Sequence, residues 1–498
     1  WPDEVDTVLI PLLLERGVKV AYAHNSTFDN VALLSALEPE LYHPLIKFMQ
    51  TDPKERSRIL FRGSSILSCK IDIAPYFNKA FDEVFYKRQY DYSKKEYYPV
   101  KHEANYKWEL EIKDSLALLP LSLGEIGQAV DFAKGETPDK FKNADHPDFE
   151  NPLSITNEDI DYCIRDCEVL FRGLQMMWET VKDLGYHGNT LPLTSGTLGS
   201  QMIGNHNKVS GVKPAIYKKK KKSWKMQTIV NEPELDDICR LSMVGGRTQV
   251  FNDEPVEGEV FGVDANSHYP SVMTDENNSW PDFRIQSAVE DADAMTDELI
   301  DEIEGCVFVD WVKPEHDKLG LFAEKNEENL LDWCLESGSR WITIPEYRFA
   351  MKQGYDLTIR VDDETGYCAI IMERLPYNPF QETITKWYDE RLIRKNNNDP
   401  SEFSLKILLN AGGFGKYVER NQDMMITTEE TWAFMPEEWT FSAVAGTDAM
   451  TYGYATKQEY KRADTTANIM GAYILSYARM ELWRVGTEIG YEHLIYCD

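Results

Sequence analysis

Short apolar runs alternate with amphipathic helical patterns through residues 1–180. The run Val18–Ala23 predicts a strand, which leads into a polar turn and then into apolar residues at helical spacing. A second strand is predicted to close at Lys113–Pro120 and to enter a helix, and a long helix is predicted from Thr156 to Trp178. This alternation predicts an α/β domain.

The stretch Glu259–Met273 predicts a strand that ends on a single acid. Val260, Phe261 and Val263 favour a strand, Asp264 closes it, and a polar turn and a proline that can open a helix follow. A carboxylate at a strand end, beside free backbone N–H groups, suits a divalent cation that carries phosphates. The competing interpretation is an Asp that caps a strand of an ordinary sheet.

Two other acids each stand four residues after a polar side chain, so a helical turn would set each pair on one side. The first pair is Asn25 and Asp29, for which an ordinary helix cap is the alternative. The second pair is Tyr162 and Asp166, on the long predicted helix.

Candidate phosphate and base ligands follow in the second half of the chain. Lys406 and Asn410 would share one helix face, and Phe414 follows two glycines, an arrangement that suits a nucleoside triphosphate. The alternative is an amphipathic surface helix with a glycine stop. The preceding helix, at Asn378–Asn396, has a basic face, and Gly245–Arg247 combines two small residues with a guanidinium that can bind phosphate.

The chain is acidic, with 84 acidic and 53 basic residues among 498 and a net charge of −31. That balance argues against nonspecific coating of nucleic acid. The local exception is Lys218–Lys222, followed by Trp224, in a predicted connector. This segment either contacts a phosphate backbone or forms a solvated linker.

Cysteine usage and hydropathy predict a reduced, cytoplasmic protein. There are eight cysteines and no Cys-x-x-Cys pair, and Cys163 and Cys167, on one helix face, are expected to be buried. The sequence has no apolar run of about 18 residues or more, so no segment is expected to span a membrane.

Short motifs, taken in order, resemble those of the family B DNA polymerases, in particular the protein-primed branch of bacteriophages and linear plasmids. The early motifs resemble those of a proofreading exonuclease. Asn25–Asp29 resembles the second exonuclease motif, Asp114–Leu119 resembles the single-strand-binding motif, and Tyr162–Asp166 resembles the third exonuclease motif. The later ones resemble a Tyr-x-Gly-Gly motif at Val244–Gly246, motif A at Asp264–Ser271, motif B at Lys406–Asn410 with Phe414, and the opening of motif C at Tyr496–Asp498.

The resemblance implies an α/β and α+β multidomain fold. A ribonuclease H-like 3′–5′ exonuclease domain would precede a palm and fingers polymerase domain with two insertions. The expected boundaries are 1–186 for the exonuclease domain, 187–257 for a connector and the start of the palm, 258–273 for motif A, 274–375 for a first insertion like a terminal-protein region, 376–417 for the fingers with motif B, 418–455 for a second insertion, and 456–498 for the palm up to the first Asp of motif C. The first exonuclease motif, the second acid of motif C and the thumb would be missing, so we expect a fragment that is itself inactive.

The same resemblance implies the site residues. Asp264 and Asp498 would lie within a few ångströms of each other and hold two Mg²⁺ or Mn²⁺ ions. Asp29 and Asp166 would hold two more in the exonuclease site, with Tyr162 orienting the attacking water and Lys140 as a further helper. The expected nucleotide ligands are Ser267, His268, Tyr269, Lys406, Asn410 and Phe414, and the expected DNA ligands are Asn25, Phe28, Ser115, Leu116, Gly245 and Gly246.

The implied function is template-directed DNA synthesis with proofreading, replicating a viral or linear-plasmid genome in the host cytoplasm. The implied partners are template and primer DNA, deoxynucleoside triphosphates and a terminal protein that supplies the priming hydroxyl, with no membrane. Two alternatives remain: a family B polymerase that extends a nucleic-acid primer, and a catalytically dead DNA-binding remnant.

Overall fold

The chain divides into two compact units in the computed structural model. The first comprises Trp1–Gln175, Leu191–Ser195 and Arg420–Lys461, and the second comprises Met176–Thr190, Gly196–Glu419 and Arg462–Asp498. The structure describes residues 12, 16, 18, 20–25, 59–62, 65–72, 86–91, 96–101, 109–142, 156–209, 217–220, 223–226, 232–252, 254–265, 267–326, 330–411, 414–428, 439–447, 450–462 and 466–497.

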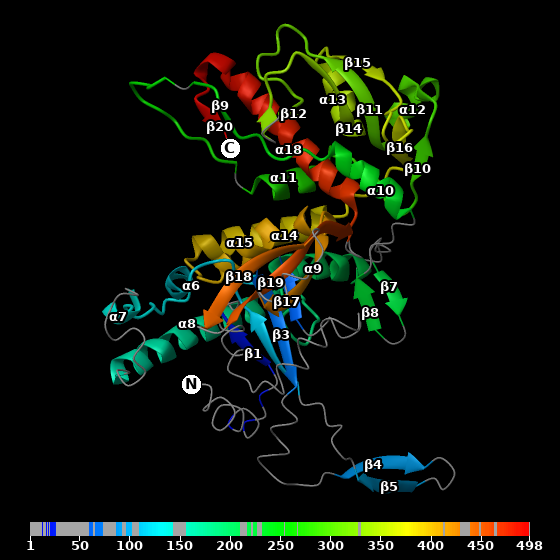
Figure 1. The fold of residues 1–498 in the computed structure, drawn as a ribbon. Coiled ribbons are helices and arrows are strands. Elements are labelled where there is room, and N and C mark those ends of the chain that lie inside the picture. Colours follow the sequence, from blue (N-terminus) through cyan, green and yellow to red (C-terminus); the bar gives the residue numbers. More distant parts are fainter. Residues whose placement is uncertain are drawn as a thin grey trace. The chain divides into compact units, whose positions relative to one another are not determined.

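A four-stranded sheet in the order β1-β6-β3-β2 forms part of the first unit (Figure 1). β1 (Val20–Ala23) runs parallel to β6 (Glu109–Asp114), while β3 (Ser65–Asp72) runs antiparallel to both β6 and β2 (Ile59–Arg62). The register places Ala23 opposite Asp114, so β1 and β6 end at one edge. Carboxyl ends of parallel strands are where α/β sheets bind ligands. The strand predicted over Val18–Ala23 is confirmed from Val20 to Ala23.

Three helices accompany this sheet: α6 (Leu123–Ala129), α7 (Asp139–Lys142) and α8 (Asn157–Asp183), of which residues up to 175 belong to the first unit. A capping box of Ser122 and Glu125 starts α6. α8 approaches α6 closely, because a Cβ on Gly173 would stand 2.6 Å from Ile126 Cγ2. The predicted long helix is confirmed and extends beyond Trp178.

The remaining strands of the first unit form two separate sheets. β4 (Tyr86–Asp91) and β5 (Glu96–Lys101) pair as an antiparallel hairpin. A three-stranded sheet has the order β17-β19-β18, with bounds Arg420–Thr428, Met450–Arg462 and Trp439–Thr447.

An antiparallel sheet built around β11 (Glu304–Val312) lies in the second unit. Its other strands are β10 (Ser287–Val289), β16 (Ala369–Met372), β14 (Ser337–Thr343) and β15 (Asp356–Ile359). The capping box of Thr343 and Glu346 starts α13 (Ile344–Lys352), which packs on β11 and β14.

The long helix α18 (Asn468–Ile489) is the buried centre of the second unit and is drawn in red in Figure 1. It contacts α10 (Pro233–Cys239), α11 (His268–Thr274), α13 and α16 (Phe414–Tyr417). Arg479 of α18 forms a buried ion pair with Glu346 of α13. Removing either partner would leave a buried charge alone, so this pair holds α18 against α13.

The other elements of the second unit are short or peripheral to α18. Two adjacent helices, α14 (Gln381–Asn396) and α15 (Glu402–Ala411), confirm the helices predicted there. The rest are α9 (Ser195–Val209, whose first residue belongs to the first unit), α12 (Asp297–Glu302), η4 (Arg240–Ser242), η5 (Ala292–Ala294), η6 (Tyr491–His493), and the strand pairs β7 (Tyr217–Lys220) with β8 (Ser223–Met226), β12 (Glu324–Lys325) with β13 (Leu331–Asp332), and β9 (Gln249–Val250) with β20 (Tyr496–Cys497).

Candidate active sites

The segment before Asp264 is not a strand, so the predicted strand at Val260–Val263 is wrong. No described strand pairs with it, and Phe261 and Val263 are 79% and 81% exposed. β-forming side chains give a strand only where a neighbour completes the hydrogen-bonded ladder. Asp264 itself is exposed and forms no hydrogen bond or ion pair with a described residue.

Asp498 lies outside the described residues, so its expected approach to Asp264 stays a prediction. The two residues before it form β20, which pairs with β9: Cys497 lies opposite Gln249 and Tyr496 opposite Val250. Tyr496 and Cys497 therefore lie beside the segment that follows Gly245 and Gly246.

A left-handed residue introduces the helix that carries Tyr269. Ser267 has φ 54° and ψ 57° and precedes α11. A serine in this region is strained, and such strain is concentrated at functional sites. Arg391 of α14 donates to Ser267 Oγ at 3.5 Å and to Glu402 of α15 at 3.0 Å. Arg391 belongs to the basic face predicted for this helix, but its position beside Ser267 was not predicted.

Residues of three separate motifs meet around Tyr269. Its ring centroid lies 5.5 Å from that of Phe414, and the His268 ring lies 6.3 Å away on a nearly parallel plane. A Cβ built on Gly246 would be 3.9 Å from the Tyr269 hydroxyl. Burial lowers the pKa of His268 below its usual value, although Glu481 acts in the opposite direction. Burial therefore favours the neutral form of the His268 imidazole beside Tyr269.

Gly245 and Gly246 have free space beside them. Neither has a positive φ, and a Cβ at either position would meet described atoms only at ordinary contact distance, 4.0 Å from Leu331 and 3.9 Å from Tyr269. The described protein atoms therefore do not explain why both positions lack a side chain. Close approach of a ligand to this backbone would explain it.

Arg247 anchors this glycine pair from inside the protein. The guanidinium donates to the carbonyl oxygens of Leu319 and Gly320 and lies 4.4 Å from the centroid of the Trp333 ring. Burial lowers the pKa of Arg247 to about 10. The sequence analysis expected this guanidinium to face phosphate; it is instead buried and structural.

The motif B helix presents the two polar residues as predicted. Lys406 and Asn410 are exposed on one side of α15, while Leu405, Leu408 and Leu409 are buried on the other. The spacing of apolar residues therefore separates a packed face from one available to a ligand.

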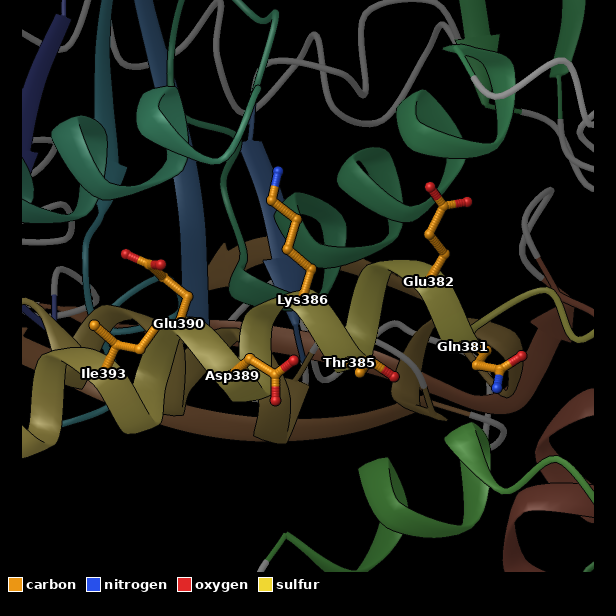
Figure 2. Close-up of a pocket in the computed structure, with 7 residues that line it drawn as sticks. All are labelled: Gln381, Glu382, Thr385, Lys386, Asp389, Glu390 and Ile393. Carbon is orange, nitrogen blue, oxygen red and sulfur yellow. The ribbon is translucent and has the colours of Figure 1, made fainter.

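A shallow groove of about 580 Å³ lies along α14 and is lined by that helix (Figure 2). Three carboxylates flank its single lysine, Lys386, and the lining residues are Gln381, Glu382, Thr385, Lys386, Asp389, Glu390 and Ile393. None of the predicted site residues lines this groove, and its charge does not favour a phosphate ligand.

The exonuclease candidates meet on α8. Lys134 Nζ lies 3.5 Å from Asp166 Oδ2 and 5.3 Å from the centroid of the Tyr162 ring. A hydrogen bond with Tyr162, and then the charge of Asp166, raise the pKa of Lys134, although burial opposes them. Asp166 Oδ1 is buried with no described hydrogen-bond partner, as expected of an oxygen that awaits a metal ion.

Lys140 was predicted as the helper, but it pairs with Asp159, and Lys134 is the lysine that lies beside Asp166. Lys140 forms an ion pair with Asp159, which also accepts hydrogen bonds from Thr156. These contacts lower the pKa of Asp159 to about 2. The chain between residues 131 and 138 has no regular structure, so periodicity could not indicate which lysine reaches Asp166.

The strand ends β1 and β6 are joined through Asp114 and Ser115. Asp114 Oδ1 accepts from the backbone N–H groups of Asn25 (3.0 Å) and Leu116 (2.9 Å). Ser115, predicted to bind DNA, is fully buried and donates to the Ala23 carbonyl. Its hydroxyl therefore holds the edge of the sheet in place and does not face a ligand.

Several predictions about this edge have different outcomes. Asn25 has φ 60° in the turn after β1, so it is not helical. Phe28 and Asp29 lie outside the described residues.

Cys163 and Cys167 are exposed, so the expectation that they are buried is wrong. No helix among the described residues is long and apolar enough to cross a membrane, and no group of three potential metal ligands occurs among them.

Comparisons with known proteins identify the family of the chain and similar folds. Residues 145–468 match the family described as DNA polymerase type B, organellar and viral. No curated protein matches the chain in sequence. Among solved structures, Phi29 DNA polymerase complexed with primer-template DNA aligns with a TM-score of 0.60, 17% identity, and coverage of 96% of this chain and 70% of that one. Its orthorhombic crystal form aligns with a TM-score of 0.58 at the same identity and coverage.

Proposed function

Because the chain belongs to the organellar and viral type B DNA polymerases, we propose that it performs protein-primed, template-directed DNA synthesis, with nucleotide addition at Asp264 and Asp498. The observation that carries this proposal is the meeting of Gly246, Tyr269 and Phe414, which come from three motifs far apart in the sequence. An ordinary surface helix or strand cap would have no reason to bring these motifs together.

The incoming nucleotide lies between α11 and α15 in this proposal. Lys406 and Asn410 contact it from the exposed face of α15, and Arg391 reaches it from beside Ser267. Guanidinium and ammonium groups neutralise the triphosphate, whose charge rises as pyrophosphate departs. Ser267 and His268 help to orient the phosphates at the start of α11.

Tyr269 and Phe414 contact the nucleotide's sugar and base. The two rings are tilted by 37° and are close enough to act as one apolar wall. A rigid phenol below the sugar leaves no room for a ribose 2′-hydroxyl, which selects deoxynucleotides. Phe414 needs only its ring to stack on the nascent base pair.

Asp264 and Asp498 would hold two divalent ions, Mg²⁺ or Mn²⁺. The Asp264 carboxylate has no described protein partner, and hard oxygen donors are the ligands that these ions prefer. When bound, the ions would activate the primer 3′-hydroxyl and neutralise the leaving pyrophosphate.

A 3′–5′ exonuclease site on the first unit is the second part of the proposal. The unpartnered Asp166 Oδ1 supports a metal-binding role that Asp29 would share. Lys134, which lies beside Asp166 and the Tyr162 ring, would stabilise negative charge there, and Tyr162 would orient a water molecule. Asn25, Phe28 and Leu116 would hold the frayed strand.

Separate substitutions in the full-length protein test the two sites. Asp264→Asn should lower the rate of nucleotide addition by at least about a hundred-fold, because a metal ligand is lost at the polymerase site. Digestion of single-stranded DNA should be unchanged, because the exonuclease site keeps its ligands. Asp166→Asn should have the reverse effect. If Asp264→Asn still extends a primer at the wild-type rate, the assignment of the polymerase site is wrong.

The priming mode needs its own experiment. We expect a labelled nucleotide to become covalently attached to a hydroxyl-bearing terminal protein when no oligonucleotide primer is present. Extension that occurs only from an oligonucleotide would favour the nucleic-acid-primed alternative. DNA binding that persists in EDTA without any turnover would identify a catalytically dead binding protein.

A further inference from the structure

Helix α8 is apolar on two opposite faces within the first unit. One face is packed: Val169 and Leu170 are buried, and Gly173 lies against Ile126 of α6. On the opposite face, Ile160 and Ile164 are 48% and 53% exposed. Surface helices normally present polar residues on the side away from the core, so this second face needs an explanation.

The exposed face forms a regular seam of four side chains: Ile160, Ile164, Cys167 and Phe171. Phe171 is 66% exposed and Cys167 is an exposed free thiol. The intervals of four, three and four residues are those of the core positions of a coiled coil. A seam of this kind is matched to another helix lying along α8 and is poorly matched to a small ligand.

One edge of the seam is acidic. Asp161 and Glu168 are exposed, stand seven residues apart, and form no ion pair with a described residue. The two nearby arginines form no ion pair with them, because Arg165 and Arg172 stack on the Phe132 ring, 3.3 and 3.8 Å from its centroid. The edge therefore presents two carboxylates that a basic side chain of a partner can pair with.

We propose that the seam of α8 docks an amphipathic helix of another protein, whose apolar stripe is flanked by lysine or arginine. Such a helix would bury Ile160, Ile164 and Phe171 and pair its basic edge with Asp161 and Glu168. The docked helix would lie on the side of α8 opposite the one that packs on α6, and Tyr162 and Asp166 would stay accessible.

A second copy of this chain fits the seam less well. In an antiparallel pair of α8 helices, the acidic edge of one copy would face the acidic edge of the other. Each chain also carries a net charge of −31, which adds long-range repulsion. Charge complementarity thus selects a basic partner.

The test uses a synthetic 21-residue helical peptide with leucine at the core positions and lysine along the edges, labelled with a fluorophore. We expect the full chain to bind this peptide and the binding to weaken by at least about ten-fold in the double variant Ile164→Gln and Phe171→Gln, because two apolar anchors are removed. Ile285→Gln, at a residue 68% exposed elsewhere, is the matched control and should bind like the wild type.

Charge reversal gives a second readout that misfolding cannot imitate. The double variant Asp161→Lys and Glu168→Lys should lose the lysine peptide and gain a peptide of the same core with glutamate edges. Bound peptide should also slow alkylation of Cys167, read by peptide mass mapping, without slowing that of Cys334, another exposed thiol.

Three results would overturn the proposal. They are no binding of the lysine peptide by the wild type, equal binding by the wild type and both double variants, and a dimer of the chain in sedimentation that Ile164→Gln and Phe171→Gln dissociate. Polymerase and exonuclease activities of the full-length protein that carries the same substitutions should remain at the wild-type level. Loss of peptide binding is thereby distinguished from failure of the proposed catalytic sites.

Discussion

Gly246→Ala separates the role of the glycine pair in the fold from its role towards DNA. The added Cβ would lie 3.9 Å from the Tyr269 hydroxyl, which is an ordinary contact, and Gly246 has no positive φ. Alanine restricts the unfolded chain more than glycine does, so the free energy of unfolding should rise by about 0.4–1 kcal/mol. The folded protein should tolerate this methyl group.

DNA binding should respond in the opposite direction. A methyl group on the open side of Gly246 would keep a phosphate from reaching the backbone N–H groups beside Tyr269. The loss of one hydrogen bond to a charged group costs about 1.5–3 kcal/mol. That corresponds to an increase of about ten- to hundred-fold in the Kd for primer-template DNA.

The assay combines thermal unfolding with fluorescence anisotropy on labelled primer-template DNA. Gly124→Ala, in α6, is the matched control. A Cβ at Gly124 would also make only an ordinary contact, 3.8 Å from Ser122 Oγ. This substitution should stabilise the fold without changing the affinity for DNA. If Gly246→Ala binds DNA as tightly as the wild type, the glycine pair does not contact the backbone of DNA. If it unfolds at a clearly lower temperature, the space beside Gly246 is not free.

Three other substitutions test separate contacts. Arg391→Ala should raise the KM for deoxynucleotides in steady-state kinetics by about ten- to hundred-fold, because a charged hydrogen-bond donor beside Ser267 is lost. Arg394 is the control, because its guanidinium already donates to Glu390 and Ser401. Arg394→Ala should therefore change stability more than KM. Lys218 and Lys225 lie opposite each other in the β7–β8 hairpin. If the hairpin contacts duplex phosphates, the double variant Lys218→Gln and Lys225→Gln should reduce the slope of log Kd against the logarithm of the salt concentration by up to about 1.8. An unchanged slope would show that the hairpin is a solvated linker. Lys140 and Thr156 hold the pKa of Asp159 down, so they stabilise the wild type above pH 3.8, and this stability is lost as the pH falls towards about 2. Lys140→Met should remove that stability. Thermal unfolding of the variant between pH 2 and 5 should therefore depend less on pH than that of the wild type.

Long periodic patterns predicted the helices well, since local spacing is enough to specify them. α8 and α15 both occur where apolar residues repeat at helical intervals, and the polar face of α15 was predicted with Lys406 and Asn410 on it. The strand before Asp264 failed because a strand also needs a partner, and no property of Val260 or Phe261 supplies one.

Residues that act from irregular segments could not be located from the sequence. Lys134 and Lys140 are equivalent by composition, and only the path of the chain brings Lys134 to Asp166. The burial of Cys163 and Cys167 was misjudged for a related reason. α8 is apolar on both faces, so its periodicity showed two candidate core faces and could not say which one faces solvent.

The distribution of cations explains how so acidic a chain can hold DNA. Many arginines of the second unit are already committed: Arg348 and Arg374 pair with buried Glu304, and Arg479 pairs with Glu346. Lys406, by contrast, is exposed and has no ion pair with a described residue. Because acidic residues outnumber basic ones by 84 to 53, affinity for DNA should depend on local contacts at the motifs more than on a broad positive surface.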